Sequence, residues 1–227
     1  MFNKKPKIEF FSTIPYLNDI KECRPKPLSQ VMPDWWKKSD TLLKSIKECP
    51  AIIHMLKDSY VIPMWCDIEI AIEDGRIGWR LPHPDFQFES HADWQFLDIA
   101  PDNVKENTAK ILKAICPWKI KTSKGYSVYQ TSSFYDFNDN FSIFPGIINT
   151  DYHHEINQQV MVYGMNNSFT IKRGDPFAVY IPFKREKFDF ETRDANKDDL
   201  ASLAKNSLRV FTKFKRGYVE TLKELNL

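Results

Sequence analysis

Glycine is scarce in this sequence, and the motifs that mark several common enzyme classes are missing. The chain of 227 residues has seven glycines against fourteen prolines, so we expect its turns to be built on proline, asparagine and aspartate. No G-x-S-x-G motif, Walker loop or dinucleotide-binding fingerprint is present, which argues against hydrolases and nucleotide-dependent enzymes. There is also no long apolar run and no signal peptide, so the sequence predicts a cytoplasmic protein that does not cross a membrane.

The cysteines and the charge balance argue against further classes. No two cysteines form a C-x-x-C pair, so we expect buried free thiols in preference to zinc ligands or disulfides. The four are Cys23, Cys49, Cys66 and Cys116. The chain has 32 Lys and Arg residues against 30 Asp and Glu residues, a net charge of +2, which argues against nucleic acid as the main partner. A protein partner or a second copy of the chain is left open.

The composition favours one folded domain. Hydrophobic residues make up 42% of the chain and aromatic residues 14%, which suffices for a sizeable core. The sequence shows no internal repeat and no flexible linker, so we predict a single domain over residues 1–227. Within it we expect an irregular and helical cover over 1–66, a β core over 67–186 and a C-terminal helix over 196–224.

The β core is predicted from a two-residue hydrophobic period. Ile68, Ile70 and Ile72 alternate with mainly polar residues, and Asp74-Gly75 follows directly, so residues 68–81 are predicted to form a β-hairpin. Short extended segments recur up to residue 183, and Asn166-Asn167 is expected to be the turn between two of them. The fold class that this pattern predicts is mainly β (α+β), a jelly-roll or double-stranded β-helix-like sandwich.

Helical patterns flank the β core. Residues 33–44 and 50–58 have the pattern of short helices, the second starting at a proline. Asn196, with Asp199 in the first turn after it, predicts the N-terminal cap of the long C-terminal helix. Its apolar residues recur at three- and four-residue spacing, so we expect that helix to pack against the sheets.

One group of residues has the order of a metal site. An H-x-D motif, a later histidine and an arginine beyond it are typical of oxygenases that hold Fe(II) with two histidines and one carboxylate and bind 2-oxoglutarate through the arginine. The residues are His91, Asp93, His153 or His154, and Arg173. A second H-x-D motif occurs at residues 83–85, so the motif has little specificity. Histidines that serve only as surface or hydrogen-bonding groups explain the pattern more simply, and no cofactor is predicted outside this alternative.

Two adjacent tryptophans provide a second alternative. Trp35 and Trp36 lie beside a proline and two lysines, and exposed indole rings on a β-sandwich bind sugar rings by stacking. The simpler interpretation is that this segment packs on the sheet.

Several stretches together resemble a known family. They lie at 24–25, 33–37, 49–50, 60–67, 117–122, 125–127, 145–151, 174–176 and 181–185. In order and spacing they resemble a domain-of-unknown-function family of bacteria and tailed phages, including marine ones, over roughly residues 8–186. The chain departs from that pattern at Asp175, where Thr is expected, and at Asn149, where Asp is expected. The resemblance implies a self-contained module that is encoded either by a bacterium or by a phage. If a phage encodes it, it is expected in the host cytoplasm or the virion.

The function predicted from the sequence is therefore a binding or structural module without a catalytic centre. The alternatives are an Fe(II)- and 2-oxoglutarate-dependent oxygenase that uses His91 and Asp93, and a carbohydrate-binding β-sandwich that uses Trp35 and Trp36.

Overall fold

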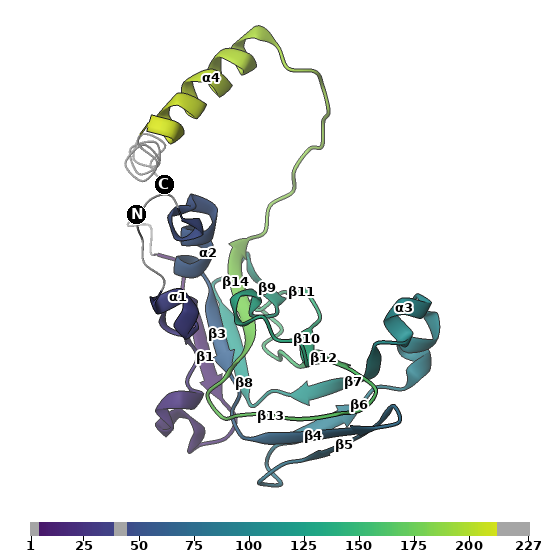
Figure 1. Cartoon of the computed structure of the whole chain (residues 1–227). Coiled ribbons are helices and arrows are strands. Elements are labelled where there is room, and N and C mark those ends of the chain that lie inside the picture. The colour runs from purple at the N-terminus through teal and green to yellow at the C-terminus, as the bar shows by residue number, and fades with distance from the viewer. Residues whose placement is uncertain (1–4, 39–44, 213–227) are drawn as a thin grey trace. The chain divides into compact units, whose positions relative to one another are not determined.

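The fold is mainly β, as the sequence predicts. A computed structural model describes residues 5–38 and 45–212, and these contain fourteen β-strands and four α-helices (Figure 1). By the contacts between its Cα atoms, the chain divides into two compact units. The first consists of residues 1–37 and 58–185, and the second of residues 38–57 and 186–227. All the strands lie in the first unit. The predicted single domain is not tested by this division, because two compact units of one chain can belong to one domain.

The largest sheet has five antiparallel strands. Their order is β11 (Gly146–Ile148), β9 (Tyr126–Thr131), β14 (Pro176–Lys184), β3 (Tyr60–Pro63) and β2 (Lys26–Pro27). Strand β14 is central, and its residues 177–180 are all buried, because apolar side chains occupy both of its faces. Figure 1 shows β14 running beside β3. Tyr180 of β14 lies directly opposite Tyr60 of β3.

The second sheet has four antiparallel strands, and a two-stranded sheet accompanies it. The order of the four is β10 (Phe141–Ile143), β12 (Gln158–Tyr163), β7 (Thr108–Ile115) and β6 (Gln87–Ser90). The pair consists of β1 (Ile8–Ser12) and β8 (Trp118–Thr122). On β12 the side chains alternate between buried and half-buried, which is the pattern of a strand with one face on the core.

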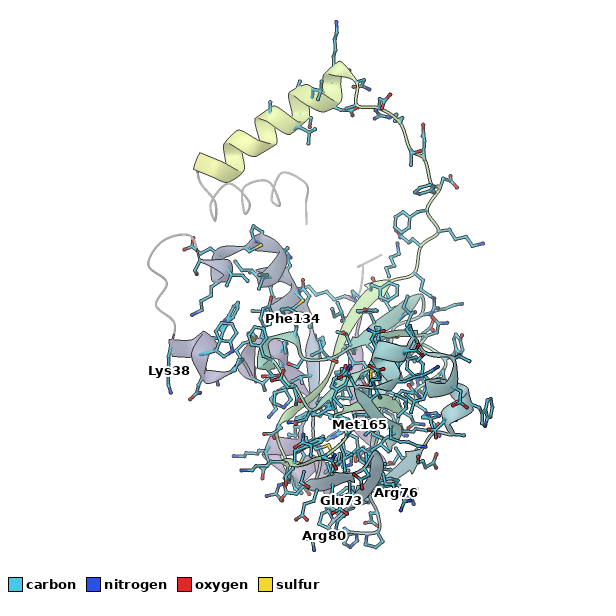
Figure 2. All side chains as sticks on the ribbon, turned by 45° about the vertical axis from the view of Figure 1, so that its right-hand side comes forward. Lys38, Glu73, Arg76, Arg80, Phe134 and Met165 are labelled. Carbon is cyan, nitrogen blue, oxygen red and sulfur yellow. The ribbon has the colours of Figure 1, made fainter. Side chains whose placement is uncertain are left out.

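The predicted hairpin is confirmed. Strand β4 (Ile68–Glu73) pairs with β5 (Arg76–Arg80), and the turn residues Asp74 and Gly75 have φ values of 49° and 72°, as a primed turn requires. Figure 2 shows the labelled side chains Glu73, Arg76 and Arg80 at this hairpin. On its other edge, β4 pairs with β13 (Asn167–Ile171). Strands β12 and β13 therefore lie in different sheets, although the chain turns between them.

The core is one aromatic and aliphatic cluster inside the first unit. Trp65, Trp118 and Phe177 are each about 1% exposed, and the rings of Trp65 and Phe177 meet edge to face with centroids 5.6 Å apart. Cys23, Cys66 and Cys116 are buried free thiols, as predicted, whereas the free thiol of Cys49 is only half-buried. Replacing one large core aromatic residue with alanine typically costs about 3–5 kcal/mol, so this cluster is a main source of the unit's stability.

The helices are short except for the last. They are α1 (Asp34–Lys38), α2 (Pro50–Asp58), α3 (Asp102–Lys105) and α4 (Lys197–Thr212). The predicted cap of α4 is confirmed, because the backbone N–H of Asp199 donates to Asn196 Oδ1 and that of Asn196 to Asp199 Oδ2. Residues 39–44 and 213–224 of the predicted helices lie outside the described residues. Helix α4 is in the second unit, so its packing against the sheets stays a prediction. None of the described helices is long and apolar enough to cross a membrane.

Candidate functional site

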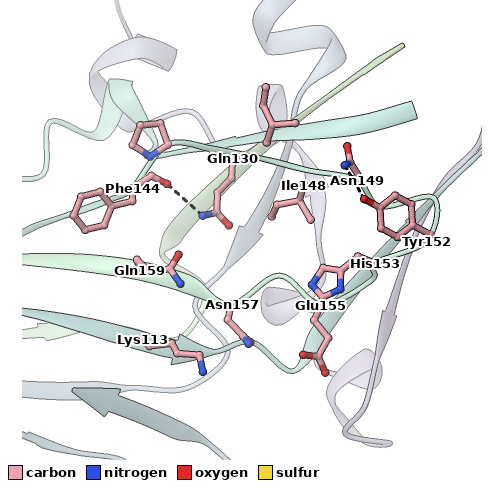
Figure 3. Close-up of a pocket in the computed structure, with 13 residues that line it drawn as sticks. Lys113, Gln130, Phe144, Ile148, Asn149, Tyr152, His153, Glu155, Asn157 and Gln159 are labelled. Atoms are coloured by element: carbon pink, nitrogen blue, oxygen red, sulfur yellow. Dashed lines mark hydrogen bonds between the residues drawn. The ribbon is translucent and has the colours of Figure 1, made fainter. Parts of the chain in front are cut away.

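A polar pocket lies beside β11, the edge strand of the five-stranded sheet. It has a volume of about 530 Å³, and its walls come from residues 144–149 with β11, from the loop between β11 and β12, and from single residues of β7, β9 and β12 (Figure 3). Four carboxamide side chains line it together with one lysine, one glutamate, one histidine and one tyrosine. Pro145, Ile147 and Ile148 add an apolar part to the wall. Polar residues therefore outnumber apolar ones in the wall, which makes it more polar than that of a typical small-molecule site.

The Gln130 side chain in this wall is held by a buried chain of hydrogen bonds. Gln158 Nε2 donates to the Tyr180 hydroxyl (2.6 Å), which donates to Gln130 Oε1 (2.9 Å). Gln130 Nε2 then donates to the carbonyl oxygen of Phe144 (3.2 Å), as Figure 3 shows. Burial raises the pKa of Tyr180 well above its ordinary value, so the hydroxyl stays neutral and remains a donor. The chain fixes which end of the Gln130 amide is oxygen, and one N–H of that amide remains for another acceptor.

The loop after β11 is fixed by a second set of polar contacts. Asn149 Oδ1 accepts a hydrogen bond from the Ser127 hydroxyl (2.7 Å), and Asn149 Nδ2 donates to the Tyr152 hydroxyl (2.9 Å; Figure 3). Two residues on, Asp151 accepts from the backbone N–H of residue 125 and forms a two-pronged ion pair with Arg185. Hydrogen bonding to Arg185 lowers the pKa of Asp151 to about 2, so the carboxylate is ionised at neutral pH.

Three polar side chains of the pocket have unused hydrogen-bonding groups. Within the described residues, the His153 ring and the Gln159 amide have no hydrogen-bond partner, and Asn157 uses only its Oδ1, which accepts from the backbone N–H of residue 116. The two charged groups each have an ion-pair partner outside the pocket: Lys113 contacts Glu89 at 3.2 Å and Glu155 lies 3.9 Å from Lys119. The pocket therefore offers neutral donors and acceptors to a ligand in preference to a net charge.

The structure does not bring the predicted metal ligands together. Asp93 forms an ion pair with Lys110 (2.6 Å), and His91 Nδ1 contacts Gln95 Oε1 (3.0 Å). His154 Nδ1 contacts the carbonyl oxygen of residue 150, whereas His153 lines the polar pocket. Among the described residues, no group of three or more His, Cys, Asp and Glu side chains is placed to hold a metal ion.

The predicted co-substrate arginine also has another partner. Arg173 lies in the turn before β14, where its guanidinium contacts Glu22 Oε1 at 3.1 Å and its backbone N–H donates to Asp67. It does not line the pocket beside β11.

The two tryptophans predicted to bind sugar differ in exposure. Trp36 is 8% exposed, and its ring packs on Tyr135 with centroids 4.9 Å apart. Trp35 is 43% exposed, and its indole N–H donates to the carbonyl oxygen of Tyr135 (3.0 Å). The pair therefore does not form a shared exposed platform, because only Trp35 is exposed.

Sequence reasoning missed the residues that line the pocket, except His153. Gln130, Asn149 and Gln159 appear in the sequence as polar positions within or beside extended segments, and nothing in their spacing relates them. Residues 145–149 of the pocket wall fall within one of the stretches on which the expected family resemblance rests, but that expectation gave them no role.

Comparisons with known proteins identify no family. No protein-family model matches the chain, and no curated protein matches it. Among solved structures, two of the dUTPase from phage phi11 of S. aureus are similar, a mutant described with a structural Mg(II) ion and a form described for its species-specific insert. Both are 9% identical and cover 77% of this chain and 97% of the other, with TM-scores of 0.34 and 0.33. Likeness at this level carries no argument about fold or function, so the chain's activity is inferred below from its own residues.

Proposed function

We propose that the protein is a binding module for a small, neutral, polar molecule, which it holds in the pocket beside β11. The observation that carries this proposal is the orientation of the Gln130 amide, which a buried chain of hydrogen bonds fixes in the wall of a pocket of about 530 Å³. A side chain whose orientation is set before the ligand arrives loses little entropy on binding.

The cost of the hydrogen-bond chain supports the same proposal. Gln158 and Tyr180 are 0% exposed and Gln130 is 3% exposed, and each buried polar group must keep its partner or lose about 1–3 kcal/mol. Apolar residues would fill this part of the core without that requirement. A function for the Gln130 amide gives a reason for the arrangement.

The ligand is expected to be neutral because the pocket's charges are paired with residues outside it. It should carry both donors and acceptors, since carboxamides offer both, and it should have an apolar face for the wall at Ile147 and Ile148. A monosaccharide or a nucleoside has this combination of groups. The apolar part of the wall contributes roughly 25 cal/mol for each Å² of apolar surface that the ligand covers.

The experiment is a thermal-shift screen of the full chain with neutral monosaccharides and nucleosides, followed by titration of any stabilising compound. Gln159→Met removes one unpaired amide at constant volume, and we expect it to weaken binding by about tenfold or more, because a ligand group loses its partner. The matched control is Gln87→Met, an exposed glutamine of β6 in the same sheet, which should leave binding unchanged.

Two results would contradict the proposal. One is that no compound of the screen stabilises the protein. The other is that the affinity of a stabilising compound stays the same in Gln159→Met and in Gln130→Met, which places its site elsewhere.

Neither alternative from the sequence has a specific observation in its favour. The oxygenase would need His91, Asp93 and a later histidine around one Fe(II) ion, and the carbohydrate platform would need both Trp35 and Trp36 exposed. The resemblance to a bacterial and phage family, and with it a place in the host cytoplasm or virion, stays a prediction.

A further inference from the structure

A second pocket in the first unit has a different chemistry. Its volume is about 300 Å³, and its walls come from residues 132–139, from the start of β10 and from the start of β14. Phe141 and Phe177 are buried there, with ring centroids 5.7 Å apart. Phe134 and Phe137 line the same pocket but are 68% and 60% exposed. The pocket therefore combines buried aromatic rings with two rings open to solvent.

Two carboxyl groups line this pocket without a counterion. Asp136 and Asp139 have no ion-pair partner among the described residues, and no basic side chain lines the pocket. Asp136 Oδ2 is buried and lacks a hydrogen-bond partner in the described part of the chain. Burial raises the pKa of Asp136, a hydrogen bond from Ser133 opposes this, and the charge of Asp175 raises it further. A cation in the pocket would compensate both the desolvation and the repulsion.

The backbone holds one of the exposed rings in place at a cost. Phe137 has φ 47° and ψ 51°, which is a left-handed backbone conformation. This conformation is rare for a bulky residue, and its population is lower than that of an ordinary conformation by a factor on the order of a few to a hundred. Trp35 packs on the ring of Phe137, with centroids 5.5 Å apart and an angle of 32° between the planes. Phe134 lies next to it, with ring centroids 5.8 Å apart, and is labelled in Figure 2.

We infer that this second pocket binds an alkylammonium cation, the group that ends a lysine side chain. Asp136 and Asp139 supply the opposite charge. The faces of Phe134 and Phe137 attract the cation through their ring quadrupoles, and the buried rings take up the methylene chain. The size of the pocket is at the lower end for small-molecule sites, which suits a single side chain or a small amine. This site is separate from the pocket beside β11 and does not depend on the function proposed there.

The test is an NMR titration of the full chain with three compounds: n-butylammonium chloride, Nα-acetyl-lysine N-methylamide and 1-pentanol as the neutral analogue. We expect saturable changes in the amide signals of residues 132–142 at millimolar concentrations of the ammonium compounds, and none with the alcohol. Binding of both ammonium compounds supports recognition of the ammonium group itself, whereas binding of the lysine derivative alone supports a lysine of a partner protein. The absence of saturable changes with either would overturn the inference.

Three variants separate binding from folding. Asp136→Asn should weaken the ammonium complex by about tenfold or more, because it removes the charge in the least solvated position. Phe134→Leu changes an exposed ring and should weaken it by about threefold without affecting folding. Asp102→Asn removes an exposed carboxylate of α3 and should have no effect. Equal affinity of Asp136→Asn, Phe134→Leu and the unaltered protein would refute the site even where saturable changes are seen.

Discussion

Replacing Tyr180 with phenylalanine is the most specific test of the hydrogen-bond chain that holds Gln130 in the pocket beside β11. The change removes one hydroxyl from a fully buried position and leaves the ring to pack as before. That hydroxyl accepts from Gln158 Nε2 and donates to Gln130 Oε1. Tyr180→Phe therefore leaves one donor and one acceptor without a partner in the core, and the Gln130 amide keeps only its hydrogen bond to the carbonyl oxygen of Phe144.

The expected loss of stability follows from these two groups. Each buried polar group without a partner costs about 1–3 kcal/mol, so the free energy of unfolding should fall by about 2–6 kcal/mol. For a chain of this length, 1 kcal/mol corresponds to a shift of about 2–4 °C in Tm, so the melting temperature should fall by roughly 4–24 °C. Ligand affinity at the pocket beside β11 should fall as well, because the Gln130 amide has to be ordered when the ligand binds.

A matched control lies directly across the sheet. Tyr60 is opposite Tyr180 in the pairing of β3 with β14, and within the described residues its hydroxyl has no hydrogen-bond partner. Tyr60→Phe should change the free energy of unfolding by less than about 0.5 kcal/mol. Denaturant unfolding of both variants, followed by circular dichroism, provides the comparison. If Tyr180→Phe is no more destabilising than Tyr60→Phe, the hydrogen-bond chain does not stabilise the fold and the argument for a pre-oriented amide fails.

Three further predictions concern other parts of the first unit. The pKa of Asp151 is about 2 in the folded protein against an ordinary value of 3.8. Its contribution to stability is therefore complete above about pH 4 and is lost as the pH falls towards 2. The free energy of unfolding of Asp151→Asn should depend less on pH in that interval. Gly174 has φ 92° and a Cβ there would lie 3.2 Å from a neighbouring side chain, so Gly174→Ala should cost about 1–3 kcal/mol in chemical unfolding. Gly78→Ala, in a strand position with open space, should be neutral or slightly stabilising. Burial raises the pKa of Cys66 to about 12 and that of Cys116 to about 11, so mass spectrometry should find both thiols unmodified by iodoacetamide near neutral pH until the protein is unfolded.

The parts of the fold that could be predicted from the sequence are those that local residues decide. The hairpin of β4 and β5 follows from alternation and the Asp74-Gly75 turn, and the cap of α4 from Asn196 and Asp199. The turn at Asn166 was also expected, but its role is different. Asn166 Oδ1 accepts from the backbone N–H of Asp74, and residue 165 accepts from that of residue 75. The segment therefore forms hydrogen bonds with the turn of the β4–β5 hairpin. Strand β13, which follows it, pairs with β4, and no local sequence pattern indicates this pairing.

The pockets were beyond sequence reasoning for a related physical reason. Gln130 is one polar residue in a short strand, and its partner Tyr180 is fifty positions away in the sequence. Only the pairing of β9 with β14 brings the two together. The predicted metal ligands show the reverse error. The order of His91, Asp93 and His153 along the chain suggested a site, but the strand pairing does not bring these residues together.

The presence of asparagine rather than aspartate at position 149 can be interpreted once its contacts are known. An aspartate at this position could accept hydrogen bonds from both the Ser127 and the Tyr152 hydroxyl groups, so the loop would keep its two contacts. The aspartate would, however, place a negative charge in the wall of the pocket beside β11. Asparagine keeps the same two partners, with Nδ2 donating to the Tyr152 hydroxyl, and adds no charge. The asparagine at position 149 thus favours a neutral ligand, as do the ion pairs of Lys113 and Glu155 with residues outside the pocket. The reason is the same in each case, because in a partly desolvated pocket an uncompensated charge would be costly whenever a neutral molecule is bound.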